Sequence, residues 1–276
     1  MPWPDRDRLA GGWPAQRVLL TGASGGIGRA LVAELAEAGA HLLISGRNAE
    51  ILEALRRHHP QRVSALPADL TLAEDRRRLV AAAREADCNM LLNAAGINRA
   101  ELFEDGDDDA IAQLVTTNLT ATLQLTRALL PQLRTAEHGR LVNLGSAFGQ
   151  IGYPGQAAYC ATKFALHGFS QALRREVADT SLRVLYIAPR ATCTAMNAPA
   201  VEAMNRELGN AMDSPERVAR QVRRAIERGR KETRLGGPER LFARLNAVLP
   251  GLVDRALRRQ LPTIRRFVGA SRGDTP

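Results

Sequence analysis

A tyrosine and a lysine one helical turn apart are the residues best placed to do chemistry in this chain. Tyr159 and Lys163 occupy positions i and i+4 of the helix that apolar spacing predicts over 157–178, so both project from one face. A phenol has a pKa of about 10, and a neighbouring ammonium favours its charged form. Tyr159 is therefore predicted to exchange a proton with a bound oxygen, and Ser146, thirteen residues earlier, to hydrogen-bond that oxygen.

Each of these side chains could instead have only a structural role and make an ordinary hydrogen bond within its own helix or strand. Their combination carries more weight, because the chain contains only two lysines, Lys163 and Lys231, and three tyrosines. The trio favours an enzyme over a protein that only binds a ligand.

A glycine-rich turn follows the first predicted strand, Arg17–Thr21. The turn reads Thr21-Gly22-Ala23-Ser24-Gly25-Gly26-Ile27-Gly28, and a helix is predicted over Gly26–Ala38. Glycines let the backbone turn tightly and approach a pyrophosphate, whose charge the free N–H groups of the helix start can bind. Placed between a strand and a helix, the turn predicts a dinucleotide site rather than a bare tight turn.

The end of the second predicted strand indicates which dinucleotide is bound. An acidic residue there would accept the ribose 2′-hydroxyl and select NAD. The chain instead reads Ser45-Gly46-Arg47-Asn48, and the Arg47 guanidinium suits a 2′-phosphate. We expect NADP(H) as the cofactor; the alternative is an ordinary exposed arginine.

Short apolar runs alternate with helical patterns along most of the chain. Runs buried on both faces are typical of parallel strands covered by helices. The fold class predicted is therefore α/β, a doubly wound parallel sheet of the Rossmann type with about seven strands and helices on both faces. The domain boundaries expected are an N-terminal extension over 1–14, a dinucleotide-binding domain over 15–237 and a C-terminal helical extension with a tail over 238–276.

The C-terminal extension is basic and amphipathic. Pro238–Arg259 carries apolar residues at helical spacing, interrupted by Pro250-Gly251, with arginines over much of the remainder. One interpretation is a helical pair that packs its apolar stripe on the body or on another subunit. The other is peripheral contact with an anionic membrane through residues 238–268. The segment after Ala270 is expected to be a frayed tail.

These motifs together resemble the short-chain dehydrogenase/reductase family over residues 15–237. The glycine turn is similar to the family's TGxxxGxG, Leu92-Asn93-Ala94-Ala95-Gly96 to its NNAG segment, and Tyr159 and Lys163 to its YxxxK motif. The resemblance implies a catalytic set of Asn118, Ser146, Tyr159 and Lys163, with Asn118 holding a water that links Lys163 to solvent. The cofactor-binding residues that it implies, together with the turn and strand evidence, are Gly22, Ser24, Gly26, Ile27, Gly28, Arg47, Asp69, Leu70, Asn93, Ala94, Gly96, Tyr159, Lys163, Pro189, Thr192 and Thr194.

One position departs from the family pattern. Arg190 stands where the family usually has glycine after Pro189, and it could face an anionic substrate group or lie on the surface. A substrate lid is expected over 195–213, and its Met196, Met204 and Met212 suggest an adaptable apolar wall.

The resulting hypothesis is an NADPH-dependent carbonyl reductase. It transfers a hydride to the carbonyl group of a small-molecule ketone or aldehyde and gives an alcohol, with Tyr159 as the general acid/base. The substrate expected is hydrophobic or carries an acyl chain. The alternatives are a 3-oxoacyl-thioester reductase, or a nucleotide-sensing or membrane-associated protein that keeps the fold and catalyses little.

The composition disfavours other classes of function. The 276 residues include 38 Lys plus Arg against 29 Asp plus Glu, a net charge of +9, but the arginines are scattered and aromatic residues are only 4%, which disfavours nucleic-acid binding. The acidic run 105–109 is expected to cap a helix rather than bind metal, and no metal site is predicted.

Three scattered cysteines indicate a reducing cytoplasm; Cys160 and Cys193 are interpreted as packing residues. The resemblance implies a homo-oligomer that pairs helices 108–133 and 157–178; a dimer is expected, and a tetramer is the alternative.

Overall fold

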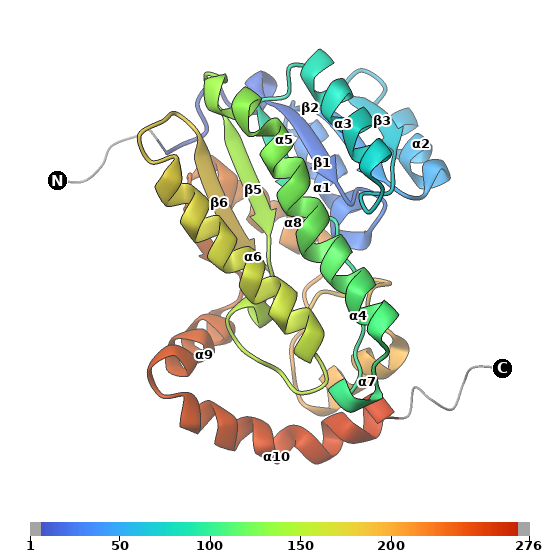
Figure 1. The fold of residues 1–276 in the computed structure, drawn as a ribbon, viewed down its shortest axis with the longest axis vertical. Coiled ribbons are helices and arrows are strands. Elements are labelled where there is room, and N and C mark those ends of the chain that lie inside the picture. The colour runs from blue at the N-terminus through green and yellow to red at the C-terminus, as the bar shows by residue number, and fades with distance from the viewer. Residues whose placement is uncertain (1–6, 270–276) are drawn as a thin grey trace.

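A computed structural model describes residues 7–269 of the chain. Its centre is one sheet of seven parallel strands in the order β3-β2-β1-β4-β5-β6-β7 (Figure 1). This confirms the predicted Rossmann-type α/β fold. The chain reverses its direction of winding between β1 and β4, and in such sheets ligands bind outside the carboxyl ends of the strands at that point. The strands are β1 (Arg17–Thr21), β2 (His41–Gly46), β3 (Val63–Pro67), β4 (Met90–Asn93), β5 (Arg140–Leu144), β6 (Arg183–Ala188) and β7 (Glu232–Arg234).

Helices cover both faces of the sheet because the strands bury apolar side chains on both sides. Helices α1 (Gly26–Glu37), α2 (Ala49–His58) and α8 (Pro215–Glu227) pack in one core, and α3 (Ala73–Glu85), α5 (Ala121–Thr135) and α6 (Ala157–Glu176) in the other. The sequence did not assign α8, although Val218, Val222 and Ile226 are fully buried beneath α1. Short helical turns lie at Trp13–Ala15, Phe103–Asp105 and Ala147–Gly149.

The predicted helix over 108–133 is interrupted. It begins as α4 (Asp108–Val115), passes through a π-helical turn at Thr116–Thr120 and continues as α5. Asp107 caps its start by accepting a 2.7 Å hydrogen bond from Ala110 N, which confirms the capping role expected of the acidic run. The π turn contains Asn118, and such turns are common at functional sites.

The N-terminal segment is attached to the body of the protein. Trp13 is buried in the core beside α1 and α8, and its Nε1 donates a 2.9 Å hydrogen bond to Glu227 Oε1. Residues 1–6 of the expected extension lie outside the described residues.

Three helices lie beyond the carboxyl end of the sheet: α7 (Pro199–Glu207), α9 (Gly237–Val248) and α10 (Pro250–Gly269), of which α10 crosses the whole end of the molecule (Figure 1). The break at Pro250-Gly251 is as predicted, but α10 runs well past Arg259. Ile264 and Val268 pack with Met204 of α7, so the extension packs on the body as the first interpretation expected. The tail after Ala270 lies outside the described residues. None of the helices in the described part combines the length and apolar character that a membrane crossing needs.

Candidate active site

The turn between β1 and α1 is built for close backbone approach. Gly22 has φ +72°, and a Cβ there would lie 2.6 Å from Ala95 N. A Cβ on Gly28 would lie 2.0 Å from Gly22 O, so only glycine fits. No side chain caps the start of α1 and its first turn holds no acidic residue. Its N–H groups are therefore available to an anion, as a pyrophosphate site requires.

A cavity of about 710 Å³ opens from this turn along the carboxyl ends of the strands, a size typical of cofactor sites. The structure brings together there most of the residues that the sequence singled out for the dinucleotide. Those lining the cavity are Gly22, Ser24, Gly26, Ile27, Gly28, Arg47, Asp69, Leu70, Ala94, Gly96, Tyr159, Lys163, Pro189 and Thr194.

Two predicted cofactor residues, Asn93 and Thr192, are not in that lining. Asn93 is buried at the end of β4, and its Nδ2 donates to Asn143 Oδ1 at 2.9 Å and to Thr126 Oγ1 at 3.3 Å. Its amide thus joins neighbouring strands and helices. Thr192 faces the second cavity described below, and its Oγ1 donates to the Arg190 carbonyl at 2.9 Å.

Arg47 and Asp69 also line the first cavity. Arg47 is exposed at the end of β2, where no carboxylate follows the strand. Hydrogen bonds from the backbone and side chain of Thr71 lower the pKa of Asp69, so its carboxylate is held charged. The Arg47 guanidinium also lowers the pKa of Asp69, so a carboxylate and a cation lie near each other in the lining, which suits the adenosine half of a phosphorylated dinucleotide.

Of the three residues predicted to carry the reaction, Tyr159 and Lys163 line this cavity, and Ser146 is hydrogen-bonded to Tyr159. Burial raises the pKa of Tyr159 to about 12, and a hydrogen bond with the Ser146 side chain opposes that rise. Lys163 Nζ lies 5.5 Å from the centre of the Tyr159 ring and donates to the Leu144 carbonyl at 3.4 Å. Burial lowers the pKa of Lys163 to about 8.

Burial is the main influence on the Tyr159 pKa in the protein alone. The lowering expected from the sequence relies on a bound oxidised nicotinamide as well as on Lys163, so it stays a prediction. Removal from water disfavours the charged forms of both Tyr159 and Lys163. The phenol is accordingly neutral at pH 7, the form that can donate a proton.

Asn118 completes this cluster. Its side chain is buried, accepts from Ile97 N at 2.8 Å and donates to the Ile97 carbonyl at 2.9 Å, so it holds the loop after β4 with both amide atoms. A Cβ on Gly96 would lie 3.2 Å from Asn118 Oδ1 and 3.6 Å from Lys163 Nζ. The absence of a side chain at Gly96 lets the asparagine and lysine approach the same point of the cleft.

A second cavity of about 340 Å³ adjoins the first, and Tyr159 lines both. Its walls include Ser146 and residues of the expected lid, Met196 and Met204. They also include residues of the C-terminal extension, whose apolar stripe the sequence related to a hydrophobic substrate; α9 and α10 contribute Glu239, Phe242, Leu257 and Gln260. The apolar spacing in the sequence indicated that these helices bury one face, but it did not show which of their residues line the cavity.

The structure also revises the interpretation of two residues near this cavity. The Arg190 guanidinium is bonded twice to the buried Asp213, at 2.7 and 2.8 Å, and lies 3.7 Å from Glu239. Arg190 thus lines the second cavity, as one interpretation of the sequence expected, but its charge is paired within the protein. Cys160 is buried as expected of a packing residue, whereas Cys193 is exposed, contrary to that expectation.

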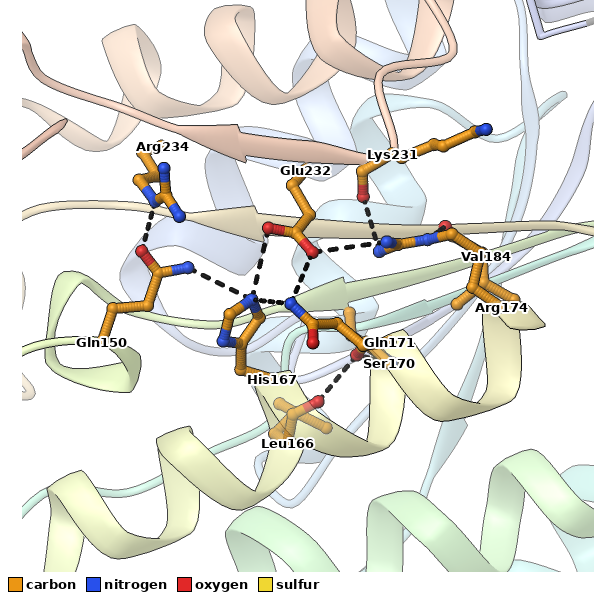
Figure 2. A network of polar contacts seen from close by, with 11 residues as sticks. Gln150, Leu166, His167, Ser170, Gln171, Arg174, Val184, Lys231, Glu232 and Arg234 are labelled. Atoms are coloured by element: carbon orange, nitrogen blue, oxygen red, sulfur yellow. Dashed lines mark hydrogen bonds and ion pairs between the residues drawn. The ribbon is translucent and has the colours of Figure 1, made fainter. Parts of the chain in front are cut away.

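A polar network supports the loop that follows Ser146 (Figure 2). Gln150, one residue beyond the turn Ala147–Gly149, contacts His167 Nε2 at 3.2 Å, and its backbone carbonyl accepts from Asn246 of α9 at 3.0 Å. His167 lies 3.3 Å from Glu232, which also accepts from Gln171 at 2.9 Å. The loop is thus tied to α6, β7 and α9, which are far apart in the sequence.

The sequence of this chain is similar to those of known proteins. The sequence matches the family model of short chain dehydrogenases over residues 16–205. It is 37% identical over 174 residues to the 3-oxoacyl-acyl-carrier-protein reductase FabG of Rickettsia bellii, covering 63% of this chain and 71% of that protein. It is 32% identical over 259 residues to the dehydrogenase/reductase SDR family member 7B of Bos taurus, covering 87% and 79%.

A solved structure has the same fold. The short-chain dehydrogenase of Burkholderia cenocepacia, in complex with NADP, aligns with a TM-score of 0.76 at 26% identity, covering 88% of this chain and 97% of that one. With the family match over most of the chain, and with the glycine turn, Ser146, Tyr159 and Lys163 lining two adjoining cavities, the chain belongs to the short-chain dehydrogenase/reductase family of oxidoreductases.

Proposed function

We propose that this protein reduces the carbonyl group of a hydrophobic small molecule to an alcohol with NADPH. The observation that carries the proposal is the position of Tyr159, whose side chain lines both the dinucleotide-sized cavity and the second cavity. A group at that boundary can give a proton to a substrate oxygen on one side while the cofactor, bound on the other, supplies the hydride.

The chain's own residues divide the proton chemistry between them. Tyr159 is kept neutral by burial and is thus ready to donate its proton to the carbonyl oxygen. Ser146, already hydrogen-bonded to Tyr159, holds the same oxygen. Lys163 stabilises the phenolate left behind and holds the nicotinamide ribose, and Asn118 positions a water that returns the proton through Lys163.

The choice of NADP(H) rests on the end of β2. Arg47 supplies the cation for a 2′-phosphate, and the carboxylate that would select NAD is missing. The NADP-bound relative from Burkholderia cenocepacia supports the same choice. A kcat/KM with NADH equal to or above that with NADPH would overturn it.

The substrate is inferred from the walls of the second cavity. Phe148, Ile151, Met204, Phe242 and Leu257 make most of it apolar, which favours a hydrophobic ketone or aldehyde. A 3-oxoacyl thioester is the second candidate, because the Rickettsia bellii relative is a 3-oxoacyl-acyl-carrier-protein reductase. The walls supplied by α9 and α10 lie outside the segment that matches the family model, so the substrate can differ from that of relatives.

The experiment is a panel of hydrophobic ketones, aldehydes and 3-oxoacyl thioesters assayed by loss of NADPH absorbance. Tyr159→Phe should abolish turnover and leave NADPH binding within about twofold, because only the proton donor is removed. Full turnover in that variant refutes the assigned acid. NADPH binding with no turnover of any carbonyl favours the nucleotide-sensing alternative.

Assembly and location are inferred on separate grounds. From the family resemblance we infer a homodimer that pairs α5 and α6 of two copies, and α6 exposes Ala157, Ala161 and Phe164 along one side. From the three scattered cysteines we infer a cytoplasmic location. The molar mass in solution, measured by light scattering, tests the dimer.

A further inference from the structure

The corner between α9 and α10 exposes apolar side chains in an unbroken run. All six residues from 247 to 252, Ala-Val-Leu-Pro-Gly-Leu, are exposed. Val248 is 76% exposed, Leu249 50% and Leu252 54%, and Leu241, two helical turns before Val248, is 62% exposed. Eight large apolar side chains are exposed among the residues that the structure describes, and these are four of them. Clustered exposed apolar residues mark an interaction surface more often than scattered ones do.

Arginines flank this apolar corner. Seven arginines lie between residues 237 and 269, against two acidic residues, Glu239 and Asp254. The segment thus holds five of the nine net positive charges of the chain. Arg244, Arg255, Arg258 and Arg259 are exposed and form no ion pair with any residue in the described range. Their guanidinium groups are available to anions outside the protein.

The two faces of the C-terminal helices have different roles. Val253, Leu257 and Ile264 point inward, and Leu257 and Phe242 form part of the second cavity. Arg255, Arg258 and Arg259 of α10 are exposed. Helix α10 itself crosses the end of the molecule (Figure 1). The apolar corner and the arginines can therefore be covered by a partner without disturbing the packing of the helices on the body.

Charge decides which partner fits this surface. In a two-fold contact between copies the same patch meets itself, so the arginines of one copy would face those of the other. A lipid bilayer with anionic headgroups instead offers apolar chains to the corner and phosphates to the arginines. We propose that the corner 247–252 inserts into the interface of an anionic bilayer, with Arg244, Arg255, Arg258 and Arg259 binding lipid phosphates. The inference goes beyond the proposed reductase activity and does not depend on it.

Vesicle flotation with the full chain tests this inference. Wild-type protein should float with vesicles that contain phosphatidylglycerol, bind pure phosphatidylcholine vesicles much less, and be released by salt. The triple substitution Val248→Ser, Leu249→Ser and Leu252→Ser should weaken binding more than tenfold by removing the inserted side chains. The charge reversal Arg255→Glu, Arg258→Glu and Arg259→Glu should weaken it on the order of 100-fold or more.

Matched controls separate the site from bulk charge and bulk hydrophobicity. Arg220→Glu, Arg224→Glu and Arg228→Glu make the same charge change at exposed positions on and just after α8 and should retain most of the binding. Leu72→Ser removes a leucine that is 56% exposed elsewhere and should have no effect. Tyr159→Phe should bind vesicles like wild type, so failure of the reductase proposal and failure of this one are distinguishable. NADPH binding and melting temperature confirm that each variant is folded.

Three outcomes would overturn the inference. One is wild-type protein that does not float with anionic vesicles. Another is vesicle binding that the α8 control weakens as much as the α10 reversal does. The third is a corner variant that binds vesicles normally but has half the molar mass of wild type in solution, which would assign the surface to a second copy of the chain.

Discussion

Replacing Lys163 by methionine should make the protein more stable while abolishing its activity. The ammonium lies in a site that removes it from water, and burial lowers its pKa from 10.5 to about 8. At about 1.4 kcal/mol per tenfold change in proton affinity, this lowering corresponds to a cost of about 3 kcal/mol to the folded state at pH 7. Methionine has a similar length and no charge to desolvate, but it loses the weak 3.4 Å hydrogen bond to Leu144 O, worth about 1 kcal/mol.

The expected net gain is therefore about 2 kcal/mol. A chain of 276 residues unfolds with an entropy of roughly 0.6 kcal/mol/K, so Tm should rise by about 3 °C. The gain depends on pH in a defined direction. The unfolded chain holds the lysine proton up to about pH 10.5 and the folded protein releases it near pH 8, so wild-type stability rises between these values. The advantage of Lys163→Met should be full below pH 8 and disappear toward pH 10.5.

Urea unfolding of both proteins without cofactor, at about pH 7 and about pH 9.5, measures this difference. Lys231→Met is the matched control, because Lys231 is the other lysine of the chain and is exposed. Its stability should equal that of wild type at both pH values. A Lys163→Met protein that is less stable than wild type at pH 7, or equally stabilised at both pH values, would refute the reasoning.

Three further predictions concern the cofactor, a buried ion pair and a glycine. Arg47→Asp should lower kcat/KM with NADPH by roughly 100-fold and change that with NADH by only a few fold, because a carboxylate repels the 2′-phosphate and accepts a 2′-hydroxyl; steady-state kinetics measure both. Asp213→Asn should cost about 3 kcal/mol in urea unfolding at pH 7, because Arg190 loses a charged partner that is almost fully buried. Gly155→Val should destabilise the protein by about 2 kcal/mol, because Gly155 has φ +76° and a Cβ there would lie 3.2 Å from Val268 Cγ2; proteolysis within α10 should become faster.

Each of these predictions has a contrary outcome. An Arg47→Asp enzyme that still prefers NADPH would place the 2′-phosphate elsewhere. The hydrogen bonds from Arg190 lower the pKa of Asp213, so the stability that this carboxylate contributes is present above its unfolded pKa and lost as pH falls through the lowered value. The Asp213→Asn deficit should shrink at acidic pH, and a deficit that does not change with pH contradicts the charge argument. For Gly155, unchanged cleavage of α10 would show that the loop and the helix are not coupled.

The sequence by itself determined the sheet, the glycine turn and the cluster of Ser146, Tyr159 and Lys163. These features depend on short-range patterns: apolar runs for buried strands, i and i+4 for one helix face, and glycines where a strand joins a helix. The order of the parallel strands then brings their carboxyl ends to one edge, and with them the residues that follow each strand.

The tertiary structure decided what depends on burial and on contacts between distant segments. The sequence places Lys163 near Tyr159 but does not tell how little water reaches them, and this burial raises the pKa of Tyr159 in the protein alone. Arg190 is paired with Asp213, which lies 23 residues away, and Asn93 bonds with Asn143, 50 residues away. Which apolar residues of α9 and α10 face the second cavity and which face outward is set by the packing of α10 on α7, because an amphipathic pattern defines a face but not its partner.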